Sequence, residues 1–176
     1  MKKIALTFSL MASVLFADNF TLKSDTLKGQ LTKKQEFIGF GCSGENISPQ
    51  LSWSDAPKET KSFALTVYDP DAPTGSGWWH WVVFNIPKNV TMLEEGFGNK
   101  PSKDMLQSIT DYGINGFGGA CPPLGDKAHQ YIFTIHALDV DKLDLNEKTN
   151  AATVGYYINQ HTIAKSTLVS YYGRGK

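Results

Sequence analysis

The fold of this chain is decided by the stretch SFALTVYDPDAPTGSGWWHWVVFNIP, residues 62–87. In its first part, apolar residues alternate at Phe63, Leu65 and Val67, which is typical of a strand with one buried face. Residues 81–86 are almost continuously apolar, which is typical of a strand that is buried on both faces. Prolines and glycines fill the segment between them, so the stretch predicts two strands joined by a stiff turn.

Further strands are predicted on both sides of this stretch. Residues 131–138 are rich in β-branched and aromatic side chains and predict a third strong strand. Weaker strands are expected at residues 20–22, 36–40 and 51–53. Strands and helices do not alternate along the chain, so we expect a mainly β domain.

The end of the chain is predicted to be helical. Apolar residues recur there at three- and four-residue intervals after Asn150, a suitable N-cap, and stop before Gly173. This pattern predicts an amphipathic helix of about twenty residues, with a break near Asn159. A second, short helix is expected at residues 103–109.

The first residues, MKKIALTFSLMASVLFA, predict an export signal. Lys2 and Lys3 precede an uncharged, largely apolar run at residues 4–16, and Ala17 offers a cleavage site. A buried helix or a retained anchor is the alternative. The run is shorter than the roughly 18 apolar residues of a membrane span, so no stable membrane insertion is expected. We expect residues 18–176 to form one domain that is periplasmic or secreted.

Charge and cysteine content bear on the possible partners and on the covalent structure of the protein. Without Lys2 and Lys3 the chain has 15 basic and 17 acidic residues, a net charge of −2, which argues against nucleic acid as a partner. The only cysteines are Cys42 and Cys121. In an oxidising compartment such a pair is usually bridged, and we predict a disulfide, with two separate buried thiols as the alternative. No CxxC motif indicates a zinc site.

Polar groups that could carry chemistry lie at the strand ends of the opening stretch. Asp69 ends the first strand, and Pro70 and the following turn hold it and Asp71 stiffly. His80 opens the second strand two positions before Val82, so both are expected on one face. If the two strands pair, Asp69 and His80 lie close together at the same end of the pair.

A second segment, GFGGACPPLGDKAHQYIF (residues 116–133), has the same design. Gly118 and Gly119 allow the backbone to approach a ligand closely and to expose N–H groups. His129 and Tyr131 are two positions apart at the start of the third strand, so both point to one face.

Structural roles are the alternative for each of these residues taken singly. A metal site built from Asp69, Asp71, His80 and His129 is disfavoured because no ligand pair has a tight metal-binding spacing. Nucleophilic catalysis is also disfavoured, since no serine lies in a GxSxG motif. We therefore expect neither a metal nor a cofactor.

Several motifs taken together resemble the phosphatidylethanolamine-binding protein family, which includes the Raf kinase inhibitor proteins, and in particular its bacterial branch. They are DPDAP at residues 69–73, His80, GACPPLG at residues 119–125, then His129 and Tyr131. FGCSGENISPQLSW at residues 40–53 and YYGR at residues 171–174 belong to the resemblance as well. One departure is Gln130, where many members have arginine.

The resemblance implies a fold and a site. The fold is an antiparallel β-sandwich with C-terminal helices. The site is a small pocket that binds anions, typically phosphate or a phospholipid head group. Its implied lining is Asp69, Asp71, His80, Gly119, Ala120, Cys121, His129 and Tyr131.

These observations predict an exported anion-binding protein and favour binding over catalysis. A protein that inhibits a protease or binds another envelope protein is the alternative. A hydrolase that uses Asp69, His80 and His129 as general acid and base comes third. By analogy with bacterial relatives a homodimer is an expected assembly, although no motif in the sequence indicates it.

Overall fold

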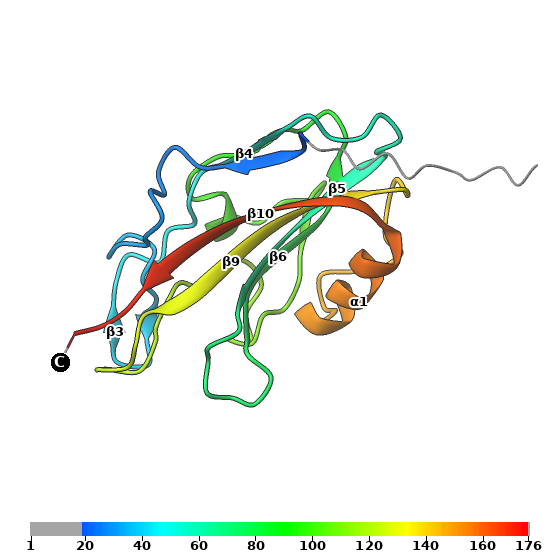
Figure 1. The fold of residues 1–176 in the computed structure, drawn as a ribbon. Helices are drawn as coiled ribbons and strands as arrows, with labels where there is room; N and C mark the ends of the chain where they lie inside the picture. Colours follow the sequence, from blue (N-terminus) through cyan, green and yellow to red (C-terminus); the bar gives the residue numbers. More distant parts are fainter. Residues whose placement is uncertain (1–18, 176) are drawn as a thin grey trace, which may run out of the picture.

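The computed structural model describes residues 19–175 and shows two antiparallel sheets that pack against each other, with one helix beside them (Figure 1). The predicted export signal at residues 1–17 lies outside the described residues. Within the described residues, none of the helices has the length and apolar character needed to cross a membrane.

The larger sheet contains the three strands that the sequence predicted most strongly. Its strand order is β10-β9-β5-β6-β8, with every neighbouring pair antiparallel. The central strands are β5 (Ser62–Asp69), β6 (Trp78–Pro87) and β9 (His129–Leu138), and all three predictions are confirmed. The edges are β10 (Thr162–Tyr172) and β8 (Leu106–Gln107).

The smaller sheet has the order β1-β4-β7, from β1 (Thr21–Lys23), β4 (Leu51–Ser54) and β7 (Met92–Leu93). A separate two-stranded hairpin joins β2 (Ile38–Gly39) to β3 (Cys42–Ser43). Strands β1 to β4 lie within or next to the weaker strand predictions, whereas β7 was not predicted.

The core of the sandwich lies between the two sheets. Leu65 of β5, Val83 of β6 and Phe133 of β9 are fully buried and belong to the same cluster as Leu51 and Trp53 of β4. Alternate residues of the long strands therefore point into this core, as a period of two requires. The predicted antiparallel sandwich is confirmed.

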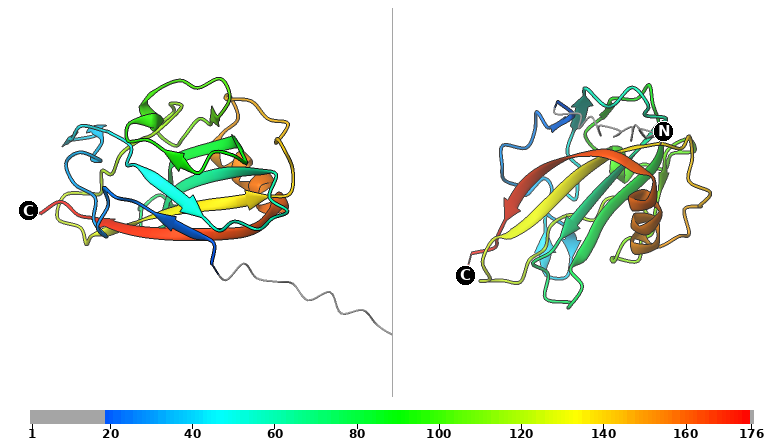
Figure 2. Two further views of the ribbon diagram at one scale, coloured as in Figure 1. Left: turned by 90° about the horizontal axis from the view of Figure 1, so that it is seen from above. Right: turned by 45° about the vertical axis from the view of Figure 1, so that its right-hand side comes forward.

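The opposite face of the larger sheet is covered at one end by α1 (Ala151–His161), as both views of Figure 2 show. The Asn150 side chain caps the helix by accepting a hydrogen bond from the Thr153 N–H. Val154 and Ile158 of α1 pack with Val82 and Phe84 of β6 in a second buried cluster. This second layer explains why β6 is apolar on both faces.

The predicted C-terminal helix is correct only in its first half. It ends at His161, and the rest of the segment forms β10, which pairs with β9 along its length. Ala164, Leu168 and Tyr172 pack against the sandwich core. Residues four positions apart share a face on a strand as well as on a helix, so their spacing did not distinguish the two structures.

The short helix predicted at residues 103–109 is also wrong. Leu106 and Gln107 form β8, which pairs with Phe84 and Val83 of β6. The buried Gln107 accepts a hydrogen bond from the Trp81 indole N–H at 2.7 Å. This contact is between residues far apart in the sequence, so local propensity could not reveal it. A 3-10 helix lies instead at Phe97–Asn99.

His136 is a buried histidine on the side of β9 that faces α1. Its Nδ1 donates to the Thr162 hydroxyl oxygen at 3.1 Å, and that hydroxyl donates to the Ile158 carbonyl at 2.7 Å. Burial, and then the charge of Lys165, lowers the pKa of His136 to about 4. The folded protein therefore takes up this proton at a lower pH than the unfolded chain does.

We expect this histidine to make the fold sensitive to acid. Its stabilising contribution is complete above about pH 6.5, and about 3 kcal/mol is lost as the pH falls to about 4. His136→Gln should remove this part of the pH dependence of the free energy of unfolding, measured by urea denaturation at pH 7 and pH 4. The control His161→Gln, at a partly exposed histidine, should retain it. An unchanged pH dependence in His136→Gln would contradict the prediction.

Candidate functional site

Asp69 and Trp78 pair at the end of the β5–β6 hairpin, so the two strand ends that the sequence suggested are indeed adjacent. The turn between them fixes the Asp69 carboxylate. Its Oδ1 accepts hydrogen bonds from the N–H groups of Asp71 at 2.8 Å and Ala72 at 3.1 Å. Turns in which an Asp side chain binds the following backbone are a common use of this residue. Asp69 is buried beneath the turn.

A β-bulge in β6 determines the direction of His80. Val67 pairs with Trp81 and Tyr68 pairs with Trp79, so His80 is the extra residue that has no partner on β5. Trp81 belongs to the sandwich core, whereas Trp79 packs against the cluster around α1. Bulges of this kind change the direction in which a side chain points.

The bulge turns His80 towards the sandwich side of the sheet. Its ring lies 5.0 Å from the ring of Tyr131, a residue of the sandwich core. Val82 belongs to the cluster around α1 on the opposite face. The expectation that His80 and Val82 share a face is therefore wrong, because the alternation of a regular strand does not hold across a bulge.

A cavity of about 170 Å³ lies where these strand ends meet. It is smaller than the roughly 300–1,000 Å³ pockets that hold drug-sized ligands, so it suits a small polar group. Its lining consists of Phe40, Asp69, Ala72, Pro73, Thr74, Trp78, His80, Tyr112, Cys121, Pro122, Pro123, His129 and Tyr131. The structure thus brings together five of the predicted residues, namely Asp69, His80, Cys121, His129 and Tyr131.

The other predicted residues lie beside the cavity. Asp71 accepts hydrogen bonds from Lys127 Nζ at 2.7 Å and the Gln130 N–H at 2.9 Å, and Lys127 holds the pKa of Asp71 below its usual range. The N–H groups of Gly119 and Ala120 are used within the protein, by the Asn46 side chain and the Gln35 carbonyl.

Asp69 and His129 form a buried pair in the cavity wall. His129 Nδ1 donates to Asp69 Oδ2 at 2.8 Å, and both residues are at most 3% exposed. His129 Nε2 lies 3.4 Å from Asp126 Oδ2, so a carboxylate faces each ring nitrogen. The carboxylate of Asp69 therefore fixes the orientation of the His129 ring, as carboxylates next to functional histidines commonly do.

His80 is held differently, by a backbone carbonyl. Its Nδ1 lies 2.8 Å from the Gly118 oxygen, which can only accept, so Nδ1 carries a proton. Burial lowers the pKa of His80 below its ordinary value. The side chain is therefore neutral near pH 7, and its Nε2 is a hydrogen-bond acceptor.

Two buried donors of the cavity wall are left unused. The Tyr131 hydroxyl and the Trp78 indole N–H have no hydrogen-bond partner among residues 19–175. Burial raises the pKa of Tyr131, so the hydroxyl keeps its proton. An unpaired buried polar group costs about 1–3 kcal/mol, so both donors are suited to meet an acceptor on a ligand.

Tyr112 is a wall residue that the sequence did not indicate. Its ring packs against His80 and stacks on Phe37, and its hydroxyl donates to the Gly119 carbonyl at 2.7 Å. A Cβ at Gly118 would collide with the Tyr112 ring. The absence of a side chain at Gly118 therefore makes room for the Tyr112 ring. The Gly118 N–H donates to the His80 carbonyl. In the sequence, the proximity of Tyr112 to the pair Gly118–Gly119 was the feature that could have indicated this packing.

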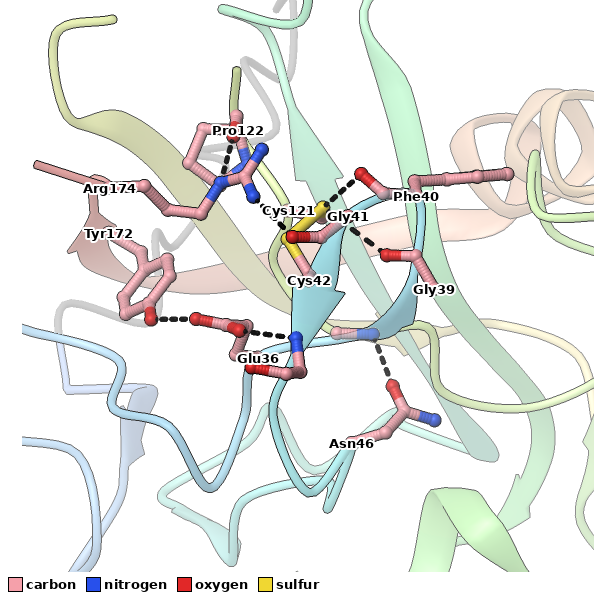
Figure 3. Close-up of a disulfide and its surroundings, with 12 residues drawn as sticks. Glu36, Gly39, Phe40, Gly41, Cys42, Asn46, Cys121, Pro122, Tyr172 and Arg174 are labelled. Carbon is pink, nitrogen blue, oxygen red and sulfur yellow. Dashed lines mark hydrogen bonds between the residues drawn. A yellow bond between two sulfur atoms is a disulfide. The ribbon is translucent and has the colours of Figure 1, made fainter. Parts of the chain in front are cut away.

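The predicted disulfide between Cys42 and Cys121 is present, with the two Cα atoms 5.9 Å apart (Figure 3). It links the β2–β3 hairpin to the segment after Ala120. Arg174 ties the same two segments, because its Nε donates to the Pro122 carbonyl and its Nη1 to the Gly41 carbonyl.

This linked hairpin supplies one wall of the cavity through Phe40. Phe40 and Gly41 form the two-residue hairpin turn, and both have positive φ, 52° and 79°. Glycine adopts this conformation readily, whereas an aromatic residue rarely does. The Phe40 ring lies 5.8 Å from the ring of Tyr112, so the turn and the tyrosine wall the cavity together.

Asp and His side chains in one cavity raise the question of a metal ion. Among the described residues, no group of three or more His, Cys, Asp or Glu side chains has an arrangement that could hold one. His80 Nδ1 and both oxygens of Asp69 already have partners within the protein. The Tyr131 hydroxyl and the Trp78 indole N–H remain available to bind a ligand.

Known proteins share this architecture. The crystal structure of Escherichia coli YbcL, described as a new member of the mammalian PEBP family, superposes with a TM-score of 0.85 at 47% identity and covers 88% of this chain and 98% of that one. A phosphatidylethanolamine-binding protein homolog from Chlamydia trachomatis gives a TM-score of 0.74 at 33% identity, over 89% of this chain and 98% of that one.

Sequence comparison leads to the same family. YbcL of E. coli, a UPF0098 protein, is 46% identical over 171 residues, which cover 95% of this chain and 92% of YbcL. The family model of the phosphatidylethanolamine-binding proteins matches residues 23–173. This match spans the whole larger sheet, the helix and the whole cavity wall. The chain belongs to the phosphatidylethanolamine-binding protein family.

Proposed function

We propose that this chain binds a small phosphorylated anion, such as inorganic phosphate, a phosphate ester or a phospholipid head group, in the cavity at the ends of β5 and β6. One observation carries the proposal. The Tyr131 hydroxyl and the Trp78 indole N–H are buried donors without partners among residues 19–175, and both residues line this cavity. Phosphate oxygens are strong acceptors for such donors.

The size of the cavity limits the part of a ligand that can enter. A volume of about 170 Å³ is well below the roughly 300–1,000 Å³ of pockets that hold drug-sized ligands. A phosphate or an ethanolamine phosphate fits such a space, whereas acyl chains remain outside. The family name adds a phospholipid head group to the candidates.

We propose that binding takes place in the periplasm or outside the cell. Residues 1–17 have the pattern of an export signal. The Cys42–Cys121 disulfide supports this location, because disulfides persist mainly in oxidising compartments.

Tyr131→Phe is expected to weaken binding of inorganic phosphate and phosphoethanolamine about tenfold, because it removes one hydrogen bond to a charged ligand. Isothermal titration calorimetry of residues 18–176 measures this directly. The control is Tyr171→Phe, at a tyrosine of β10 that is 46% exposed and does not line the cavity. A wild-type protein that binds neither ligand, or equal losses in the two variants, would refute the proposed site.

A protein partner in the envelope, such as a protease, is the second candidate. It is favoured by large apolar side chains that remain exposed, since Phe40 at the cavity mouth and Leu124 beyond Pro123 are 71% and 69% exposed. An interaction through this surface should survive Tyr131→Phe and be lost in Phe40→Ser.

A hydrolase would instead turn over a phosphoester, and His129→Ala would abolish that turnover.

A further inference from the structure

The two ring nitrogens of His80 differ in what they can do for a ligand. Nδ1–H is used by the Gly118 carbonyl, so the neutral ring presents Nε2 as an acceptor. Among residues 19–175 the ring of His80 makes its side-chain hydrogen bond through Nδ1, and His80 lines the cavity. A ligand in the cavity therefore meets an acceptor here, although an anion would favour a donor.

The surroundings keep this nitrogen unprotonated. Burial lowers the pKa of His80 and outweighs the opposing influence of the backbone of Gly118 and Gly119 and of the carboxylates of Asp69 and Asp111. The remaining titratable rings packed against His80 belong to Tyr112 and Tyr131, which burial keeps neutral because it raises the pKa of both.

The cavity lining also lacks a side chain with a permanent positive charge. Of the described residues around the cavity, none is lysine or arginine, and Asp69 brings a carboxylate. Both oxygens of that carboxylate accept hydrogen bonds within the protein, Oδ1 from two backbone N–H groups and Oδ2 from His129. An anion that carries no proton can accept hydrogen bonds from the Tyr131 hydroxyl and the Trp78 indole N–H. It has no proton to donate to His80 Nε2, whose lone pair repels it.

We propose that His80 makes the site selective for ligands that bring a hydrogen-bond donor of their own, so that hydrogen phosphate is bound and sulfate is rejected. This inference rests on the proposed function and names the ligand class more narrowly. Hydrogen phosphate offers a P–O–H group to Nε2, as the monoanion of a phosphate monoester does. Sulfate has the same tetrahedral shape and has no proton to offer at neutral pH. A phosphodiester head group must supply its donor elsewhere, as the ammonium of ethanolamine can.

The test compares affinities for pairs of ligands that differ in this one property. Calorimetric titration at pH 7 with inorganic phosphate and with sulfate should show phosphate bound about 10- to 100-fold more tightly, since a buried acceptor is left unpaired by sulfate. Dibutanoyl phosphatidylethanolamine and dibutanoyl phosphatidylcholine form the second pair, because only the first has N–H groups on its nitrogen and neither has a free hydroxyl. Binding in the first pair alone identifies a free phosphate ligand, and binding in the second identifies a head group.

A variant assigns the selectivity to His80. In His80→Asn the shorter amide can still donate to the Gly118 carbonyl, but the acceptor at the position of Nε2 is lost. We expect the phosphate-to-sulfate ratio of affinities to fall towards one. The matched control is His136→Asn, at a histidine that is also buried and has a lowered pKa but lies on the other face of the sheet. Its ratio should remain that of the wild type.

Each outcome decides between the two proposals. Phosphate and sulfate bound equally well by the wild type would overturn the selectivity and leave the proposed function standing. A ratio that persists in a folded His80→Asn protein would overturn the role of His80. If the wild type binds none of the ligands, the proposed function fails and this inference fails with it. If His80→Asn does not fold, the wild-type ratio still tests the selectivity.

Discussion

Asp69→Ala is expected to lower the free energy of unfolding by about 3–5 kcal/mol, because it leaves three hydrogen-bond donors without their acceptor, at about 1–3 kcal/mol each. Asp69 is 3% exposed and His129 is 1% exposed, so the variant leaves His129 Nδ1 inside the protein without the carboxylate that it binds. The N–H groups of Asp71 and Ala72 lose their acceptor at the same time. Urea denaturation at pH 7, followed by tryptophan fluorescence, measures the loss.

Asp71→Ala is the matched control, since it changes the other aspartate of the same motif. The Asp71 side chain is 13% exposed, and its ionic partner Lys127 is 70% exposed, so water can replace much of this interaction. We expect a loss of about 1 kcal/mol. Equal losses in the two variants would contradict the view that the Asp69–His129 pair holds the cavity wall. Asp69→Asn should lie between them, because its amide oxygen can still accept from the turn.

The strands of the sandwich were predictable because their sequence signals are local. The alternation of residues 63–67 correctly predicts a strand whose Phe63, Leu65 and Val67 enter the sandwich core, but its other face is buried as well, with Ala64 in the cluster around α1. The continuous apolar run of β6 has a second layer to match it, with Val83 in the sandwich core and Val82 against α1. In these two segments the hydrophobic pattern was compatible with a strand and not with a helix.

The second half of the C-terminal segment was not predictable in this way. Spacings of four residues fit either a helix or a strand, and β10 exists because β9 offers it a free edge to pair with. The β-branched residues Thr162, Ile163, Thr167 and Val169 were the available signal for a strand. Pairing between strands is a tertiary contact, and it outweighed the helical periodicity.

The residues of the site were partly predictable for the same reason. Asp69, His129 and Tyr131 lie at strand ends, where their side-chain directions follow from regular alternation. His80 reaches the cavity only through a bulge that no sequence pattern announces. Tyr112 and Phe40 come from loops distant in sequence, so only the folded chain brings them to the cavity.

The double variant Cys42→Ala/Cys121→Ala is expected to lose about 4–5 kcal/mol of unfolding free energy. The bridge joins residues 79 positions apart and so removes much of the conformational freedom of the unfolded chain. This chain-entropy figure is an upper value, since the unfolded chain is already partly compact. Urea denaturation of the variant, and of the wild type treated with a dithiol reductant, should give the same loss.

Arg174→Ala separates the covalent link from the contacts around it. Arg174 donates to the Pro122 and Gly41 carbonyls, on the same two segments that the disulfide joins. Its removal acts on the folded state alone, and we expect a loss of about 1–3 kcal/mol, smaller than that of the double cysteine variant. If the cysteine variant lost less than Arg174→Ala, the hairpin that carries Phe40 would be held against the cavity by hydrogen bonds and packing. The disulfide would then be unnecessary for that wall.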